Sequence, residues 1–148
     1  MPSLEDALSA TLLGINRDFE RADRDLHEEV NLASQVLQRL SNGLASLELV
    51  KVEESERGMV YMLRLLGEGY GEEIGAFRVP ARGYPLIAAG SRGSIANQSP
   101  NLDDRAALSA YFAGMGSNPD SPLVVKAAYL MRRKPPEVQR IGVPVPRT

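Results

Sequence analysis

The first forty residues place their apolar side chains along one side of a helix. Two lines of apolar residues, each with a spacing of seven, run through this segment: Leu12, Phe19, Leu26, Ala33 and Leu40, and Leu8, Ile15, Ala22 and Val36, with Glu29 interrupting the second line. Such spacing predicts an amphipathic, heptad-like helix. Gly14 followed by Asn16 predicts a break, which would give a short helix over 4–13 and a long one over 17–42. Gly43 suits the end of the second helix.

The apolar period then shortens to two, which is typical of β-strands. We expect strands over residues 47–52, 59–66, 74–79 and 84–89, separated by short turns that contain glycine or proline. Such short connections favour an antiparallel meander. The strand over 59–66 is apolar on nearly both faces, so we expect it to be central and covered.

The last third of the chain predicts two helices. A polar loop over 90–101 comes first, and Asn101 is the expected cap of a helix with Asp103 and Asp104 in its first turn that ends near Gly114. The pair Ser121–Pro122 predicts the start of another helix, because serine is a good cap and proline suits the first helical position.

Together these elements predict an α+β fold: a long N-terminal helix, a four-stranded antiparallel meander and two C-terminal helices. A chain of 148 residues is long enough for one hydrophobic core. We assign residues 1–134 to a single α+β domain. Residues 135–148 are rich in proline, so we expect an extended or disordered C-terminal tail.

Several classes of chemistry have no recognisable residues in this chain. It contains no cysteine, which excludes disulfides, zinc–thiolate sites and thiol nucleophiles. Its only histidine, His27, lies one helical turn after Asp23, so we expect a surface ion pair rather than catalysis. We therefore predict no catalytic residues, no metal site and no cofactor. No apolar run approaches the ~20 residues of a membrane-spanning helix, and the acidic N-terminus lacks a signal peptide's positive charge. We expect a cytoplasmic protein with no membrane partner.

Charge is divided unevenly between the two halves. Residues 1–74 hold 15 acidic and 7 basic side chains, a net charge of −8, whereas residues 75–148 hold 4 and 10, a net charge of +6. Two explanations remain open. The halves can attract each other within one fold or in a dimer, which we favour, or the basic half can bind an external polyanion.

The candidate binding residues are basic or aromatic and lie at predicted turns, loops and helix ends: Arg78, Arg82, Tyr84, Arg92, Arg132, Arg133 and Lys134. Arg78 and Arg82 come shortly before a Gly-Tyr-Pro corner. They form either an exposed basic corner or internal pairs with the acidic N-terminal helix, and we favour the pairs narrowly. Arg92 lies in a Gly-Ser-Arg-Gly-Ser loop that could approach an anion. A flexible connection between sheet and helix is the favoured reading of that loop.

The stretch from Phe77 through Pro80 to Tyr84-Pro85, together with the order of elements, resembles the ubiquitin-conjugating-enzyme-like fold over residues 17–115. That resemblance implies a non-catalytic, binding variant, because active members carry a catalytic cysteine after the Tyr-Pro element and this chain has none. A generic antiparallel α+β fold of other ancestry is the alternative that we favour.

The leading functional hypothesis is a non-enzymatic protein–protein interaction module of unknown partner that also self-associates as a homo-oligomer. It rests on the missing catalytic chemistry and on the heptad-like helix. The alternative is binding of a phosphate-bearing ligand or nucleic acid through the arginines of the second half. The scarcity of aromatic residues, 5% of the chain, argues mildly against single-stranded nucleic acid.

Overall fold

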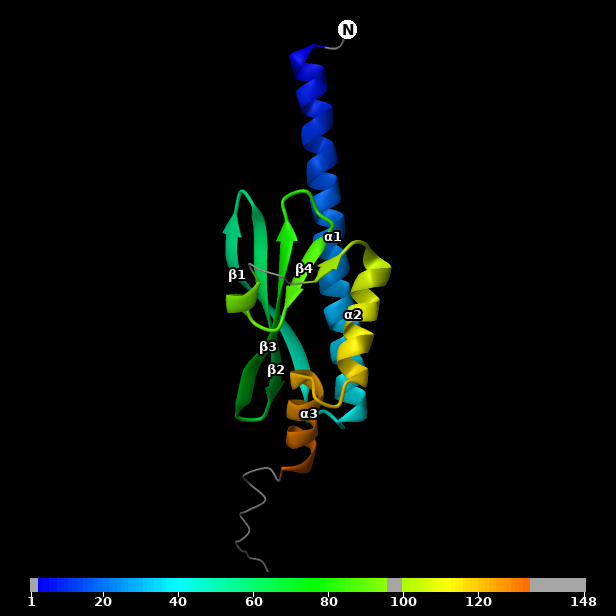
Figure 1. Ribbon diagram of the computed structural model, residues 1–148, viewed down its shortest axis with the longest axis vertical. Coiled ribbons are helices and arrows are strands. Elements are labelled where there is room, and N and C mark those ends of the chain that lie inside the picture. The colour runs from blue at the N-terminus through cyan, green and yellow to red at the C-terminus, as the bar shows by residue number, and fades with distance from the viewer. Residues whose placement is uncertain (1–2, 96–99, 134–148) are drawn as a thin grey trace, which may run out of the picture.

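A computed structural model describes residues 3–95 and 100–133 and confirms the α+β fold (Figure 1). In chain order the elements are α1 (Leu4–Leu40), β1 (Ser46–Ser55), β2 (Gly58–Gly67), β3 (Tyr70–Pro80), β4 (Leu86–Ala89), the short 3-10 helix η1 (Arg92–Ser94), β5 (Asn101–Leu102), α2 (Arg105–Ser117) and α3 (Pro122–Arg132). The tail predicted for residues 135–148 lies outside the described residues.

The first helix is continuous, and the predicted break near Gly14 is wrong. α1 spans 37 residues, is capped by the Ser3 side chain, and has Glu5 and Asp6 in its first turn. A single glycine costs a helix only about 1 kcal/mol relative to alanine, which the good helix formers around it outweigh. The predicted stop is confirmed, since α1 ends at Leu40 and Gly43 has a φ of +82°. The first turns of α1 extend beyond the sheet and the other helices (Figure 1).

The strands form one antiparallel sheet in the order β1-β2-β3-β4-β5. The first four strands make the expected meander, and they are mostly longer than the sequence suggests. Asn101 is not a helix cap, because it pairs with Ile87 of β4 as part of the short fifth strand. The cap of α2 is Asp104, whose carboxylate accepts a hydrogen bond from the Ala107 amide at 2.8 Å. The helix continues past Gly114 to Ser117 and stops where Asn118 precedes a proline.

All three helices pack on one face of the sheet. The main core joins buried residues of α1 (Ala22, Leu26, Val30), of the strands (Leu47, Tyr61, Leu63, Leu65, Ile74, Phe77, Val79, Leu86, Ala88, Leu102), of α2 (Leu108, Phe112) and of α3 (Ala127, Leu130). The Ser121 hydroxyl caps α3 at the Val124 amide, as predicted, and also donates to the Met115 carbonyl of α2 at 2.7 Å. α3 is thereby fixed against the end of α2.

The second face of the sheet is covered only at one end. There Val60, Ala76, Ala89 and Ile95 form a small separate cluster, with Ile95 reaching across from the segment after η1. Along the rest of β2, Met62 is only partly buried on this face. The expectation of a strand covered on both sides therefore holds for one end of β2.

Candidate functional site

An apolar groove with a volume of about 520 Å³ lies between α1, α2 and α3. Its lining comprises Glu29, Leu32, Ala33, Val36, Leu37, Leu40, Leu47, Ser109, Phe112, Ala113, Gly116, Leu123, Val124, Ala127, Ala128 and Met131. Only Glu29 and Ser109 in this set have polar side chains. The groove is therefore an apolar surface of the kind that usually marks a binding site.

The α1 wall of the groove comes from apolar residues beside the stripe that faces the sheet. Leu32, Val36 and Leu40 follow one another at intervals of four, so they form a ridge on the helix surface. They are 51, 42 and 64% exposed. Because the sheet-facing stripe already supplies the core, these three side chains leave a second apolar face of α1 open to solvent.

The opposite walls are built from small side chains. Ala113 and Gly116 of α2 and Ala128 of α3 line the groove and are exposed. Residues without long side chains let a neighbouring backbone approach closely. Met131 closes the α3 side with a flexible thioether that can adapt to different apolar partners.

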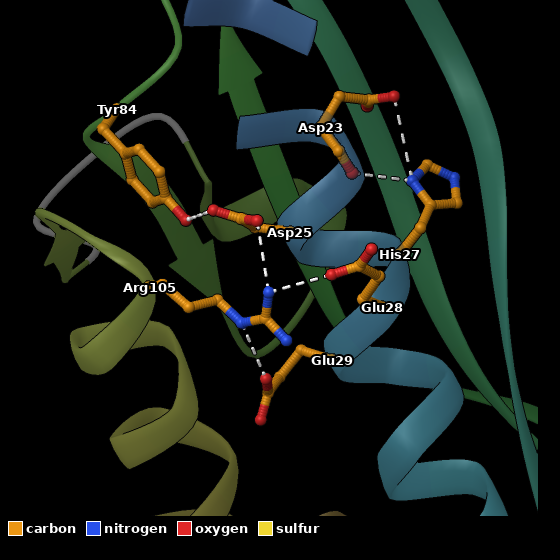
Figure 2. Close-up of polar contacts among 7 residues, drawn as sticks. All are labelled: Asp23, Asp25, His27, Glu28, Glu29, Tyr84 and Arg105. Carbon is orange, nitrogen blue, oxygen red and sulfur yellow. Dashed lines mark hydrogen bonds and ion pairs between the residues drawn. The ribbon is translucent and has the colours of Figure 1, made fainter. Parts of the chain in front are cut away.

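A charged cluster fastens α2 to α1 (Figure 2), and it adjoins the groove through Glu29. The Arg105 guanidinium donates to Asp25 and Glu29 at 3.1 Å and to Glu28 at 3.0 Å. Asp25 and Glu29 are largely buried, each 14% exposed. The hydrogen bond to Glu28 is the main contribution that raises the pKa of Arg105. Since Glu29 also lines the groove, this cluster fixes the spacing of the two helices where the groove begins.

The Gly-Tyr-Pro corner docks onto the same stretch of α1. Gly83 has a φ of +90°, and a Cβ placed there would lie 2.5 Å from the carbonyl oxygen of Asp18. Tyr84 follows in a cis peptide with Pro85, and its hydroxyl donates to Asp25 at 2.7 Å. Burial, followed by the hydrogen bond to Asp25, raises the pKa of Tyr84. The corner therefore serves a structural purpose: it holds α1 against the sheet.

His27 makes the local contact that its spacing predicts. Its Nδ1 lies 2.8 Å from the Asp23 carbonyl oxygen and 3.8 Å from the Asp23 carboxylate, one turn earlier on α1 (Figure 2). Asp23 also accepts a hydrogen bond from the buried Tyr61 hydroxyl, and burial, with that bond, raises the pKa of Tyr61. The helix–sheet contact thus has a polar component.

The arginines proposed as a binding set occupy separate parts of the fold. Arg78 and Arg92 do come together, in a polar hollow on the second face of the sheet, but Glu53 and Glu73 line the same hollow. The Arg92 amide already donates to Glu73 at 2.8 Å. A bound anion would have to compete with these carboxylates.

The remaining basic residues lie elsewhere. Arg82 lines a small hollow beside Asp18, Arg21 and Tyr84. The pairing of the acidic helix with a distant arginine, expected for Arg78 and Arg82, is made in this structure by Arg105.

At the end of α3, Arg132 and Arg133 lie over tyrosine rings. The Arg132 guanidinium is 5.7 Å from the Tyr129 ring centre and that of Arg133 is 5.8 Å from the Tyr70 ring centre. Arg133 also donates to the Glu68 carbonyl oxygen. Lys134, the third member of this predicted cluster, lies outside the described residues.

The comparisons and the residue geometry assign no known activity. No family model, curated protein or solved structure matches the chain, so the resemblance to the ubiquitin-conjugating-enzyme-like fold stays a prediction. Within residues 3–95 and 100–133, no group of three or more acidic, histidine or cysteine residues could hold a metal ion. None of the helices described there has the length and apolar character needed to cross a membrane.

Sequence reasoning did not find the groove, although part of its signal was visible. Val36 and Leu40 were included in the heptad lines, and Leu32 was not. The ridge is exposed because the sheet covers only the neighbouring stripe of α1, and the heptad pattern does not distinguish the two. The small residues of α2 and α3 carried no sequence signal of their own, because alanine and glycine occur in any packed helix.

Proposed function

We propose that this protein is a non-enzymatic protein–protein interaction module that binds an amphipathic helix of its partner in the groove between α1, α2 and α3. The observation that carries the proposal is the groove's lining, which is apolar apart from Glu29 and Ser109. Amphipathic helices bind such grooves by inserting residues spaced three and four apart.

The chemistry of the lining favours binding over catalysis. An enzyme site needs convergent polar groups that can move protons or stabilise developing charge. The carboxylate of Glu29 is already engaged by Arg105 at 3.1 Å. The apolar remainder of the groove gains most by excluding water against another apolar surface.

The partner's chemistry follows from the two ends of the groove. The acidic residues Glu28 and Glu29 lie near one end, and Arg132 follows Met131 near the other. A helix with basic residues at the end nearest Glu28 and acidic residues at the end nearest Arg132 would complement both. An apolar stripe of leucine or similar residues between them would fill the groove.

Selection of helical peptides by surface display tests this proposal. Ala113→Glu places a charge in the groove, and Ala110→Glu places the same charge on α2 at an exposed position that does not line it. We expect peptides selected on the wild type to have apolar residues at helical spacing, to bind Ala110→Glu normally and to bind Ala113→Glu at least about 10-fold more weakly. Equal binding to both variants, or no enrichment of such helices, would reject the groove as the binding site.

A phosphate-bearing ligand or nucleic acid remains the second hypothesis, with less support. The predicted arginines are divided among the hollow of Arg78 and Arg92, the corner of Arg82 and the end of α3. A polyanion site would require several of them to act together. Binding of a nucleic acid that weakens steeply with added salt, and that is lost on changing Arg78 and Arg92 to glutamine, would favour this alternative.

A further inference from the structure

We infer that residues 141–145, which follow α3, add a parallel strand to the open edge of β1 in the same chain. β1 is the first strand in the order of the sheet, so among the described residues it is paired on one side only, by β2. An open strand edge carries unpaired backbone amides and carbonyls that can bind a further extended segment. The inference does not depend on the proposed function, because it uses the backbone edge of β1 and not the side chains that line the groove.

One hydrogen bond shows which residues of β1 point toward the open edge. The Leu47 amide donates to the Ser34 hydroxyl of α1 at 3.0 Å, so it does not point toward β2. Successive residues of a strand direct their backbone groups to alternate sides, so Leu49 and Lys51 also point toward the edge. The irregularity in pairing between Lys51 and Glu53 ends this regular stretch. The edge therefore offers the carbonyl oxygens of Leu47 and Leu49 and the amides of Leu49 and Lys51.

The sequence Ile-Gly-Val-Pro-Val-Pro over residues 141–146 matches this edge. A proline has no amide hydrogen, so within a strand it is tolerated where that position points away from the neighbouring strand. Pro144 and Pro146 are two residues apart and therefore point to the same side, while Val143 and Val145 keep their amides for the other side. In a parallel pair, Val143 and Val145 can make all four hydrogen bonds that the edge offers.

The position of α3 favours the parallel direction. The end of α3 lies beside the segment that leads into β1, because Arg133 and Leu44 line the same small hollow (Figure 1). The connection over residues 134–140 can span up to about 23 Å, and residue 141 needs to reach only the beginning of β1. An antiparallel strand would place residue 141 beside Lys51, about 23 Å along β1 from Leu44. The connection would then have no length left in which to reverse direction.

The parallel register also places the apolar side chains of the segment on the uncovered face of the sheet. Residues 141, 143 and 145 would lie beside the regular part of β1, with Val145 next to Val50. Val50 is opposite Met62 of β2, and both side chains are only partly buried. A third apolar side chain there would reduce their contact with water. A shift of two residues in either direction would carry part of the apolar set beyond the regular stretch.

The charges of the two segments are complementary. Residues 134–148 hold three basic side chains and one acidic one, whereas β1 holds three glutamates and one lysine. Arg147 is two residues beyond Val145, so it would project on the same face of the sheet. Glu53 lies on that face, where it is opposite Val60 and lines the polar hollow. Arg147 and Glu53 would therefore be neighbours at the end of the pairing.

Amide hydrogen exchange of the full chain, followed residue by residue by NMR, tests the pairing. We expect the amides of Leu49 and Lys51 to exchange at least about 10-fold faster in Val143→Pro than in the wild type, because that proline removes a donor that faces the edge. Gly142→Pro is the matched control, since residue 142 points its amide away from β1, and it should leave both rates unchanged. The Val50 amide points toward β2, so an unchanged rate there establishes that each variant is folded.

The absence of native cysteine allows the direction of the strand to be read from engineered disulfides. Within one chain, Val50→Cys with Val145→Cys should form a disulfide more readily than Lys51→Cys with Ile141→Cys, the pair that an antiparallel strand would bring together. Equal exchange in Val143→Pro and the wild type, faster exchange in Gly142→Pro, or a preference for the antiparallel disulfide would each overturn the inference. Protection that disappears on dilution together with a dimer would also overturn it, because the edge would then bind the tail of a second copy.

Discussion

Replacing Gly83 with alanine should destabilise the fold because of its contact with α1 as well as its backbone conformation. A φ of +90° is strained for any residue with a side chain, at a cost of about 1–2 kcal/mol. The new Cβ would also lie 2.5 Å from the Asp18 carbonyl oxygen and 2.9 Å from its carbonyl carbon. Backbone atoms cannot rotate away, so the corner must move off the helix, at a further cost of about 1–3 kcal/mol.

Gly69 supplies the matched control for this prediction. Its φ is +63°, and a Cβ placed there has nothing within 4 Å. Gly69→Ala therefore reports the backbone strain alone, about 1–2 kcal/mol. Gly83→Ala should cost about 2–5 kcal/mol, the sum of strain and overpacking. The difference between the two variants measures how tightly the corner is docked on α1.

Urea unfolding monitored by circular dichroism would give both free energies. With a slope of about 2 kcal/mol per molar urea, Gly83→Ala should lower the urea concentration at the midpoint by roughly 1–2.5 M, and Gly69→Ala by clearly less. Equal shifts for the two variants would refute the reasoning, because the corner would then not be held against Asp18 in solution.

Three further predictions concern the polar contacts between the helices and the sheet, and urea unfolding checks each of them. Ser34→Ala should lower the free energy of unfolding by about 1–3 kcal/mol. The buried Ser34 hydroxyl accepts a hydrogen bond from the Leu47 amide at 3.0 Å, and loss of the hydroxyl leaves that amide unpaired. An unchanged free energy would show that the amide finds another partner. Arg105→Ala should lower the free energy of unfolding by about 1–3 kcal/mol after allowance for solvent screening, because it leaves three neighbouring carboxylates without their cation. Arg105→Lys should restore part of that loss. Equal stability of both variants and the wild type would contradict this prediction. Burial is the main cause that raises the pKa values of Tyr61 and Tyr84 in the fold. Above about pH 10 the unfolded chain therefore loses these protons first, and the free energy of unfolding should fall as pH rises. The fall should be shallower when both tyrosines are replaced by phenylalanine, and an unchanged slope would contradict this prediction.

The sequence predicted the order of elements well because most of their signals are local. The heptad lines identified α1, the alternation identified the strands of the meander, and Ser121–Pro122 located the start of α3. The error at Asn101 occurred where a tertiary contact overrides local preference. Asn101 has the chemistry of a helix cap, but pairing with Ile87 draws it into the sheet and leaves the cap to Asp104.

The site was less accessible to sequence reasoning, because it depends on which apolar residues the core leaves uncovered. Leu26 and Val36 look alike in a heptad pattern, yet the first is fully buried by the sheet and the second lines the groove. The sequence predicts that the acidic stretch of α1 pairs with Arg78 and Arg82. Arg105 makes the contact instead, because α2, not the β3–β4 corner alone, packs beside that stretch.

The measurement that tests the central proposal most directly is a methyl NMR titration of the full chain with a selected helical peptide. The groove supplies probes on two of its walls, Leu32 and Val36 on α1 and Val124 on α3. We predict that these methyl signals shift together and saturably, and that Ala113→Glu abolishes the shifts while Ala110→Glu preserves them. Shifts concentrated instead at Ile87 on the other face of the sheet, or at Leu8 in the first turns of α1, with the groove methyls unchanged, would contradict the proposal that the groove is the binding site.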